Sequence, residues 1–384
     1  MNSPSSLGLF KAFLRLGVTA FGGPAMIAHI KEIAVARFKW LDESDFRDGI
    51  ILCQAIPGAT VMQMAAYVGL RIKGFKGAFL AYAGFVLPAF VLMLVLSILY
   101  EHSHSLPRIS ALFAGLQVIV VSIVFNATYY FGKSLVKNLK NVVIAACSCV
   151  LLFYNASPFL IIIAAGLSGI LLFRGTDTFA VSHAGRRKGE QYLKPIILFV
   201  SLVVTGVAGL YFIDPELCKL ALLMFKIDLF AFGGGFSSVP LMLHEIVDVR
   251  GWMDSNTFMD GIALGQVTPG PIVITSTFVG YLLHGLPGAI IATTAIFTPS
   301  LLMVVSLTPI FDKLKASPYF TCATKGILAS FVGLLFFVSV KFALAVQWDV
   351  PGILLALAAF TALFKKVDVV YVVLIASIIS VLIF

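Results

Sequence analysis

Two kinds of glycine- and proline-rich motif recur in this otherwise apolar chain, and both could expose backbone N–H groups. Phe21-Gly22-Gly23-Pro24 and Gln54-Ala55-Ile56-Pro57-Gly58 return as Phe232-Gly233-Gly234-Gly235 and Gln266-Val267-Thr268-Pro269-Gly270. Glycine leaves the backbone unrestrained and proline removes a donor, so such motifs break helices. A helix that starts after a break directs free N–H groups and its positive dipole end at the gap. The motifs therefore predict anion binding at helix breaks, although a single break is more often a kink or a close helix crossing.

Paired basic residues accompany the first kind of motif. Arg15 and Lys226 each lie six residues before the Phe of a Phe-Gly-Gly motif, in apolar runs. A cation at the bilayer centre costs about 2.5–3.5 kcal/mol, so it is usually kept for a partner or a pathway. The alternatives are snorkelling to the interface and, for Lys226, pairing with Asp228. The predicted anion-binding residues are Arg15, Gly22, Gly23, Gln54, Pro57, Gly58, Thr60, Lys226, Gly233, Gly234, Gln266, Thr268, Pro269 and Gly270.

Other polar side chains beside the breaks have two interpretations. They could donate to oxyanion oxygens or rescue the broken backbone, and for any one of them rescue is the better interpretation; they are Gln54, Thr60, Gln63, Gln266, Thr268, Thr275 and Ser276. Glu32 and Glu245 occupy matching positions and could carry a coupled proton, or serve only as interfacial charges. The six histidines show no helical metal spacing, so neither a metal nor another cofactor is expected.

The motifs belong to a duplicated unit. They repeat at offsets of 211 and 212 residues, and between them Trp40-Leu41-Asp42 returns as Trp252-Met253-Asp254. Further along, Pro88 returns as Pro299. Agreement at one nearly constant offset indicates an internal repeat, and the function is then sought where the two copies meet.

The composition is that of an all-α polytopic membrane protein. The chain is 60% hydrophobic and 12% charged, with a mean hydropathy of +1.03 and several runs that approach the length of a bilayer crossing. In such a protein the net charge of +9 indicates positive cytoplasmic loops rather than nucleic-acid binding. The sequence contains no nucleophile elbow, phosphate loop or HExxH motif, so an enzyme is not expected.

Three segments divide the chain. The prediction is an N-terminal membrane repeat at 7–173, a basic cytoplasmic linker with one extra helix at 174–217, and a C-terminal membrane repeat at 218–384. Within the first repeat, the expected elements are broken ones at 7–36 and 49–70, an amphipathic interval at 37–48, and helices at roughly 77–100, 109–131, 141–154 and 157–173.

Loop charges predict that the two copies have opposite topology. Loop 71–76 carries Arg71, Lys73 and Lys76, whereas its counterpart 282–287 carries no Lys or Arg. Loops further along reverse this bias, so each loop that is basic in one copy is poor in positive charge in the other. This is the pattern of an inverted repeat, and the extra helix supplies the inversion. Whether the broken elements span the membrane or re-enter stays open, with the charges favouring re-entrant half-helices.

At these residues the sequence resembles the chromate ion transporter family in its long, two-domain form. The shared features are Phe-Gly-Gly-Pro before His29-Ile30, Trp40-Leu41, Gln-x-x-Pro-Gly, and Gly74-x-x-Gly77-Ala78 before Pro88. The resemblance implies export of chromate, with sulfate as a close analogue, and chromate resistance at the bacterial inner membrane. Copy one departs from the family's Pro-Gly-Pro at Ala59. Oxyanion uptake and a passive anion channel remain alternatives, and a homodimer is compatible with the sequence.

Overall fold

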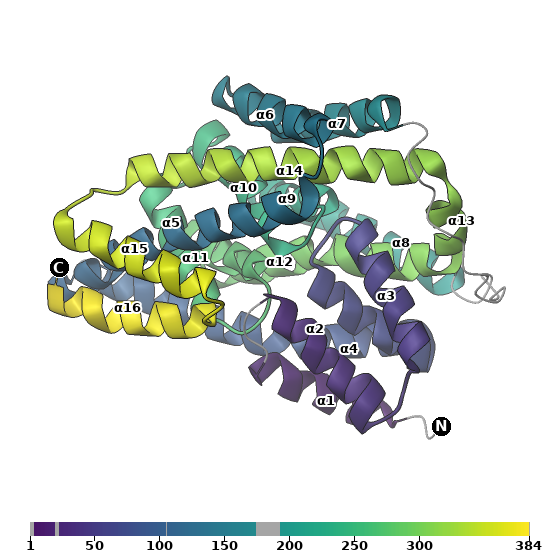
Figure 1. Ribbon diagram of the computed structural model, residues 1–384. Helices are drawn as coiled ribbons and strands as arrows, with labels where there is room; N and C mark the ends of the chain where they lie inside the picture. Colours follow the sequence, from purple (N-terminus) through teal and green to yellow (C-terminus); the bar gives the residue numbers. More distant parts are fainter. Residues whose placement is uncertain (1–3, 20–22, 105, 174–192, 384) are drawn as a thin grey trace. The chain divides into compact units, whose positions relative to one another are not determined.

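The structure is a computed structural model that describes residues 4–19, 23–104, 106–173 and 193–383. The described residues form helices and no strands, as expected for an all-α membrane protein (Figure 1). The elements up to the linker are α1 (Ser6–Thr19), α2 (Gly23–Lys31), the π-helix η1 (Glu32–Arg37), α3 (Glu43–Ala55), α4 (Thr60–Ser103), α5 (Pro107–Leu135), α6 (Leu139–Phe153) and α7 (Pro158–Leu172).

After the linker, α8 (Leu193–Ile213) is the predicted extra helix, and the remaining elements repeat the first series. The same local features return at matching positions: π-helical turns η1 and η4, and helix caps at Asp42 and Asp254. The second series is α9 (Pro215–Phe230), η3 (Gly235–Ser237), α10 (Ser238–Met242), η4 (Leu243–Val249), α11 (Ser255–Val267), η5 (Ile272–Ile274), α12 (Thr275–Leu307), η6 (Thr308–Ile310), α13 (Phe311–Ala316), α14 (Pro318–Ala345), α15 (Val350–Phe364) and α16 (Val369–Ile383).

The amphipathic interval is shorter than predicted because α3 begins at Glu43 rather than at 49. The Asp42 carboxylate accepts a hydrogen bond from the Asp45 N–H at 2.7 Å, which starts the helix. The same hydrogen bond, with help from the Ser44 hydroxyl, lowers the pKa of Asp42. An N-cap aspartate therefore sets this boundary, and hydropathy alone did not indicate it.

The predicted loop at 71–76 is instead a tight reversal inside α4. Lys73 and Gly74 leave the helical conformation, with Gly74 at φ 62°, and His284 and Gly285 do the same in α12. A Cβ atom added at Gly69 would lie 2.1 Å from the carbonyl oxygen of Gly77. Residues eight apart in a straight helix are separated by about 12 Å along its axis. The chain therefore folds back on itself at Gly74, and Gly280 with Gly288 makes the same close approach in α12.

α3 and the first half of α4 form a second antiparallel pair. Arg71 pairs with the Asp45 carboxylate, the Tyr67 hydroxyl donates to the Asp45 carbonyl oxygen, and Thr60 lies 3.5 Å from the Cys53 carbonyl oxygen. Because later residues of α4 contact earlier residues of α3, the chain reverses at Pro57-Gly58. The segment 60–73 is about 21 Å long, less than the roughly 30 Å hydrocarbon core. In copy one, the second broken element is thus a hairpin of two short helices.

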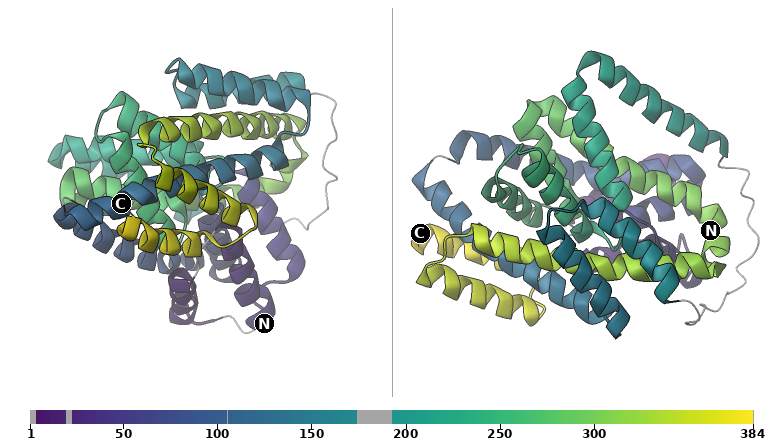
Figure 2. Two further views of the ribbon diagram at one scale, coloured as in Figure 1. Left: turned by 60° about the vertical axis from the view of Figure 1, so that its left-hand side comes forward. Right: turned by 90° about the horizontal axis from the view of Figure 1, so that it is seen from above.

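The chain divides into two compact units that cut across the sequence repeats. Unit 1 comprises the described parts of Met1–Leu92, Gly175–Gly235 and Pro269–Thr321, and unit 2 those of Met93–Arg174, Phe236–Thr268 and Cys322–Phe384. In unit 1, α9 packs along α12 (Figure 1). In unit 2, α5 lies beside α15 and α16 (Figure 2). Each unit therefore combines elements of both copies, while the predicted boundaries at 173 and 218 follow the repeat and stay a prediction.

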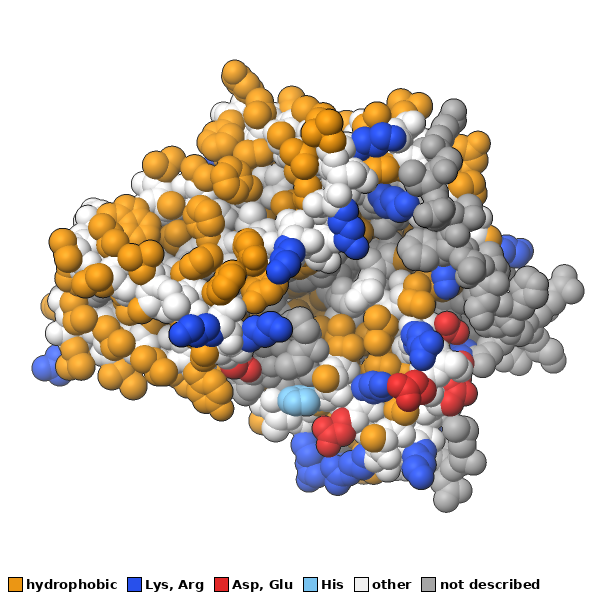
Figure 3. All heavy atoms as spheres, in the orientation of Figure 1, with side chains coloured by type: hydrophobic (Ala, Val, Ile, Leu, Met, Phe, Trp, Pro, Cys, Tyr) orange, Lys and Arg blue, Asp and Glu red, His pale blue; other side chains and the backbone are white. Residues whose placement is uncertain are grey.

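The exposed surface is suited to lipid. Five described helices are long and apolar enough to cross a membrane, and four shorter apolar helices accompany them. Large hydrophobic side chains are exposed along α15 and α16, including Leu354, Leu357, Ile375 and Ile378. Figure 3 shows hydrophobic side chains over these helices and charged side chains gathered over α1, α2 and α3. Such apolar exposure on a helical protein indicates contact with the bilayer.

The reversal at Gly74 predicts strict limits on side-chain size. Replacing Gly77 with valine should destabilise the protein by roughly 1–3 kcal/mol or more, because the new side chain would overlap backbone atoms of Gly69. The midpoint of thermal unfolding in detergent measures this loss. Gly206→Val in α8 is the control, because no atom lies within 4 Å of the added Cβ. A Gly77→Val midpoint equal to that of the control would contradict the close approach.

Candidate functional site

The tip of the hairpin formed by α3 and the first half of α4 is a buried stretch of non-helical backbone in unit 1. Residues Ile56, Pro57, Gly58 and Ala59 are all buried, and Gly58 has a φ of 117°. The Gly58 N–H donates to the carbonyl oxygen of Ala231 at 2.9 Å. Ala231 follows α9 and begins the break of the second copy. The breaks of the two copies therefore meet through a backbone hydrogen bond.

Two side chains bond further backbone groups of this tip, and a third supports one of them. The Ala59 N–H donates to the Ser300 hydroxyl at 3.0 Å, and the Gln63 amide donates to the carbonyl oxygen of Pro57. The Ser300 hydroxyl in turn donates to the Asp228 carboxylate at 2.7 Å. Gln63, Ser300 and Asp228 are fully buried. Buried backbone groups without partners are costly, and these side chains relieve that cost where the helix is interrupted.

The glycine segment of the second copy lies between two helix starts. A Cβ atom added at Gly234 would lie 3.5 Å from the Thr60 hydroxyl, at the start of α4. One added at Gly235 would lie 3.2 Å from Ile272, in the η5 turn that leads into α12. Gly233 and Gly234 have φ values of 89° and 103°, which favour glycine. We call Pro57, Gly58, Thr60, Gly233 and Gly234 the tip cluster.

The second Pro-Gly turn packs in the equivalent way. A Cβ atom added at Gly270 would lie 3.1 Å from the Cβ of Ala89, which follows Pro88 in α4. One added at Gly58 would lie 2.2 Å from the hydroxyl of Ser300, which follows Pro299 in α12. Each Pro-Gly turn thus rests against the long helix of the other copy, one residue after its proline. The two contacts differ in chemistry, since Ala89 is apolar.

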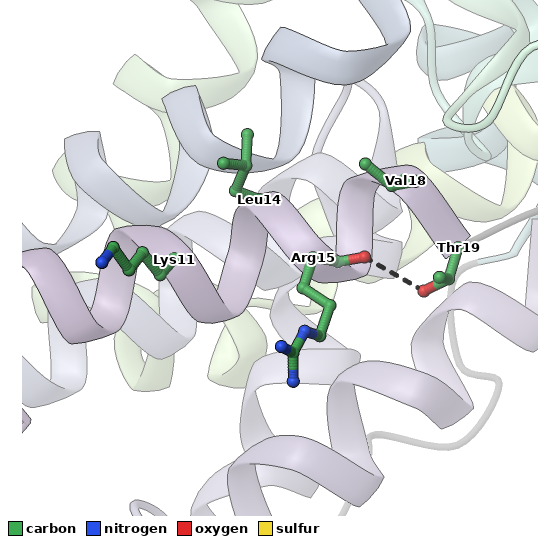
Figure 4. Close-up of a pocket in the computed structure, with 5 residues that line it drawn as sticks. All are labelled: Lys11, Leu14, Arg15, Val18 and Thr19. Carbon is green, nitrogen blue, oxygen red and sulfur yellow. Dashed lines mark hydrogen bonds between the residues drawn. The ribbon is translucent and has the colours of Figure 1, made fainter.

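The paired basic residues lie elsewhere on unit 1. Arg15 is exposed on α1 and lines a shallow hollow with Lys11, Leu14, Val18 and Thr19 (Figure 4). Its carbonyl oxygen accepts a hydrogen bond from the Thr19 hydroxyl at 3.1 Å. Lys226 is also exposed, on α9. Both cations are exposed, whereas Pro57 and Gly58 of the tip cluster are buried, and the predicted role of the cations in anion binding stays a prediction.

The other predicted residues are distributed between the units. Gln54 is exposed and Gln266 is half-buried in α11 of unit 2. The buried Thr268 hydroxyl donates to the carbonyl oxygen of Leu264, and Thr275 donates to that of Ile272, so both bond nearby backbone. Gly23 begins α2, and Gly22 lies outside the described residues. Thr60, Gly58 and Gly234 are the predicted residues that unit 1 brings together.

The predicted proton-coupling glutamates have different surroundings. Glu32 is exposed on η1, whereas Glu245 is only 6% exposed on η4. The Glu245 carboxylate pairs with Arg250, whose guanidinium also donates to the Glu245 carbonyl oxygen at 3.2 Å. Nearby in unit 2, Asp248 pairs with Lys341. The pairing gives Glu245 a structural explanation, and proton coupling through either glutamate stays a prediction.

Sequence reasoning missed Ser300 and gave Asp228 a different role. Asp228 was considered as a partner of Lys226, but its Oδ2 atom accepts hydrogen bonds from the backbone N–H and the hydroxyl of Ser300. A usable signal existed, because an acid within an apolar membrane segment is rarely kept without a function. Ser300 carried no such signal, since single serines are common in membrane helices.

The tip cluster contains the kinds of donor that can bind an anion. α4 begins at Thr60, close to Gly234, and the first N–H groups of a helix have no partner within the helix. Glycine allows a ligand to approach that backbone, and the Thr60 hydroxyl supplies a further donor. Among the described residues, no group of three or more His, Cys, Asp or Glu side chains could hold a metal ion.

These features define a multi-pass helical membrane protein whose two halves share one pattern of helix breaks. The chain belongs to the chromate transporter family, which matches residues 7–170 and again 218–381. The expected family resemblance is thus confirmed in both halves.

Similar proteins extend this finding over the full length. An uncharacterized transporter of Methanocaldococcus jannaschii is 44% identical over 384 residues, all of this chain and 95% of that protein. A probable chromate transport protein of Synechococcus elongatus is 28% identical over 381 residues, covering 97% and 94% of the two chains. A chromate transport protein of Cupriavidus metallidurans is 29% identical over 358 residues, covering 92% and 86%. No solved structure matches the chain.

The tip cluster predicts which glycine cannot be replaced. Gly58→Ala should abolish transport while leaving membrane insertion intact, because the methyl group would meet Ser300 and strain a backbone at φ 117°. Transport by purified protein in vesicles measures the effect. Gly251→Lys is the matched control. Gly251 also has a positive φ, but no atom lies within 4 Å of an added Cβ. Copy one carries Lys39 at the matching position, with a φ of 51°. Normal transport by the Gly58→Ala variant would show that the conformation of the hairpin tip is not needed for transport.

Proposed function

We propose that this protein is a secondary transporter that exports chromate across the cytoplasmic membrane and so confers chromate resistance. The observation that carries the proposal is the meeting of the two copies' helix breaks in unit 1, at the Gly58–Ala231 hydrogen bond. Relatives named as chromate transport proteins match nearly the whole chain. Sulfate, a tetrahedral dianion of similar shape, is a second expected ligand of the same site.

The proposed binding site is the tip cluster. A dianion entering the membrane loses its hydration, and the cost falls only if fixed dipoles or charges replace the water. The start of α4 supplies such a dipole beside Gly234, where Thr60 lies. Broken helices with their N-terminal ends at the substrate are a general solution in transporters built from repeats. No side chain at Gly233 or Gly234 blocks the approach of the oxyanion to the backbone.

The electrical gradient favours export. Moving one elementary charge across a membrane changes the free energy by about 2.3 kcal/mol per 100 mV. At 100 mV, the free energy of a dianion that leaves a negative interior therefore falls by roughly 4.6 kcal/mol. Uptake of the same ion would need a strong coupling gradient. Export at the inner membrane therefore agrees with both the substrate's charge and the proposed resistance. A passive channel and an oxyanion uptake transporter are the alternatives that a transport assay must separate.

Flux into proteoliposomes of purified protein tests this function directly. We expect saturable uptake of chromate that sulfate competes for, because the site recognises tetrahedral dianions by shape and charge. Trans-stimulation by internal sulfate is also expected, since a carrier reorients faster with substrate bound. Flux that follows voltage without saturation or trans-stimulation would identify a channel, and no oxyanion flux at all would overturn the proposal.

The proposal includes an inverted topology of the two copies. The turn at Gly74 lies among Arg71, Lys73 and Lys76, whereas the matching turn at Gly285 lies in a stretch without Lys or Arg. A reporter at position 74 should therefore be cytoplasmic and one at 285 external, because positive loops stay inside. Cysteine labelling from each side of the membrane measures both positions. Labelling of both from the same side would exclude an inverted repeat.

Substitutions of the exposed residues Arg15 and Lys226 test whether their positive charges contribute to oxyanion binding. If they attract the dianion, Arg15→Gln and Lys226→Gln should each raise the apparent KM for chromate several-fold, with sulfate affinity falling in parallel. Lys11→Gln is the control, because Lys11 lines the same exposed hollow as Arg15 but has no counterpart of the same charge in copy two. Unchanged competition by sulfate in both variants would assign these residues to snorkelling at the interface.

A further inference from the structure

A single buried carboxylate lies behind the hairpin tip. Asp228 is on the last turn of α9, in unit 1, and is 0% exposed. Its Oδ2 atom accepts hydrogen bonds from the Ser300 N–H at 2.9 Å and from the Ser300 hydroxyl at 2.7 Å. Its Oδ1 atom has no hydrogen-bond partner among the described residues. A buried carboxylate has about four acceptor positions, so half of its hydrogen-bonding capacity is unused.

Among the residues that the structure describes, the groups facing Asp228 are polar but not cationic. From α12 it faces Ser300, from the hairpin tip the Ala59 N–H, and from α4 Tyr82, whose hydroxyl donates to the carbonyl oxygen of Phe297. On α9 itself, Lys226 is exposed two residues away, and residues two apart in a helix do not share a face. The surroundings thus stabilise a negative charge by hydrogen bonds from one side only. An added proton at Oδ1 would remove the cost of the buried charge.

Asp228 is connected to the tip through one hydroxyl group. The Ala59 N–H donates to the Ser300 oxygen at 3.0 Å, and the same hydroxyl donates to Asp228. Ala59 immediately precedes α4, whose N-terminal end is part of the proposed oxyanion site. A charge on Asp228 therefore opposes a dianion at that helix end, while a neutral Asp228 does not.

The internal repeat indicates that this acid is not required for the fold. At the offset of 211, Asp228 matches Gly17 and Ser300 matches Ala89. The two matching positions of copy one also lie in close contacts. Gly17 of α1 lies against the Phe85 backbone of α4, and Ala89 of α4 lies against Gly270. Copy one makes these contacts without any polar side chain at the two positions. The Asp228–Ser300 pair is therefore an asymmetric addition to a crossing that forms without it.

We propose that Asp228 is the proton-binding residue of this transporter, protonated when an oxyanion occupies the tip cluster and ionised when it is empty. The inference rests on the proposed function. Oδ1 takes the proton from water as the anion binds and returns it to water when the anion leaves, so no other reactant is needed. Because linkage is reciprocal, protons and oxyanions increase each other's affinity, and one proton accompanies each anion. The exported net charge is then −1 rather than −2, and a negative interior still favours its exit.

The test compares Asp228→Asn with the wild type in proteoliposomes. In the wild type, the apparent affinity for sulfate should fall up to tenfold per pH unit above the titration of Asp228, as expected for one linked proton. Asparagine imitates the neutral acid, so the variant should keep sulfate–sulfate exchange, bind equally well at all pH values, and carry no proton with the anion. A pH-sensitive dye inside the vesicles reports the proton.

Asp214→Asn is the matched control on the same helix. Asp214 caps the start of α9 through the N–H groups of Glu216 and Leu217, and asparagine caps equally well. This variant should keep the wild-type pH dependence and proton movement. An Asp228→Asn protein that retains both would overturn the inference while leaving the proposed function intact. A wild type that transports no oxyanion would overturn the proposed function itself.

A spectroscopic measurement covers the case in which Asp228→Asn does not fold. Infrared difference spectra of the wild type, with sulfate against chloride, should show the C=O stretch of a buried protonated carboxyl group appearing on sulfate binding. Ser300→Ala should shift that band, because the carboxyl group loses its hydroxyl partner. Sulfate binding without any carboxyl band, or a band that Ser300→Ala leaves unmoved, would overturn the assignment to Asp228.

Discussion

Backbone groups in a water-free interior must find partners within the protein, and the structure of unit 1 follows from this constraint. At the hairpin tip the Gly58 N–H bonds Ala231, the Ala59 N–H bonds Ser300, and the Pro57 carbonyl oxygen accepts from Gln63. Each partner comes from a different place in the chain, so the tip holds together the breaks of both copies. The close helix crossings that allow these bonds require glycine where backbone meets backbone.

The contact between a Pro-Gly turn and a long helix occurs once in each copy, and the two contacts differ in polarity. Both Pro-Gly turns contact the opposite long helix just after a proline, but the contact residue is Ser300 in one case and Ala89 in the other. Only the Ser300 side adds a buried acid. We propose that the shared breaks bind the anion and that this asymmetric polar pair couples it to one proton. In that proposal the repeat supplies the fold, and the Asp228–Ser300 pair supplies the coupling.

Much of this architecture could be predicted from the sequence. The helix breaks at Pro57-Gly58, Gly233-Gly234 and Pro269-Gly270 follow from glycine and proline chemistry, and the repeat is visible in the motif spacing. The reversal at Gly74 was not recognised, because a basic stretch beside glycine also fits an ordinary loop. The Ser300 contacts span 241 and 72 residues, and no local pattern encodes partners so distant. Charge counting favoured re-entrant half-helices, which stays a prediction; the structure shows that α3 and the first half of α4 form a hairpin in copy one.

Binding of the oxyanion at the tip cluster can be tested by anomalous scattering from chromium in crystals grown with chromate. We expect one chromium peak within hydrogen-bonding reach of the Thr60 hydroxyl and the Gly233-Gly234 backbone. The peak should disappear in crystals of a Gly234→Val variant, whose side chain would occupy the approach to that backbone. A chromium peak beside Arg15 in the exposed hollow of α1, with none at the tip cluster, would contradict the account.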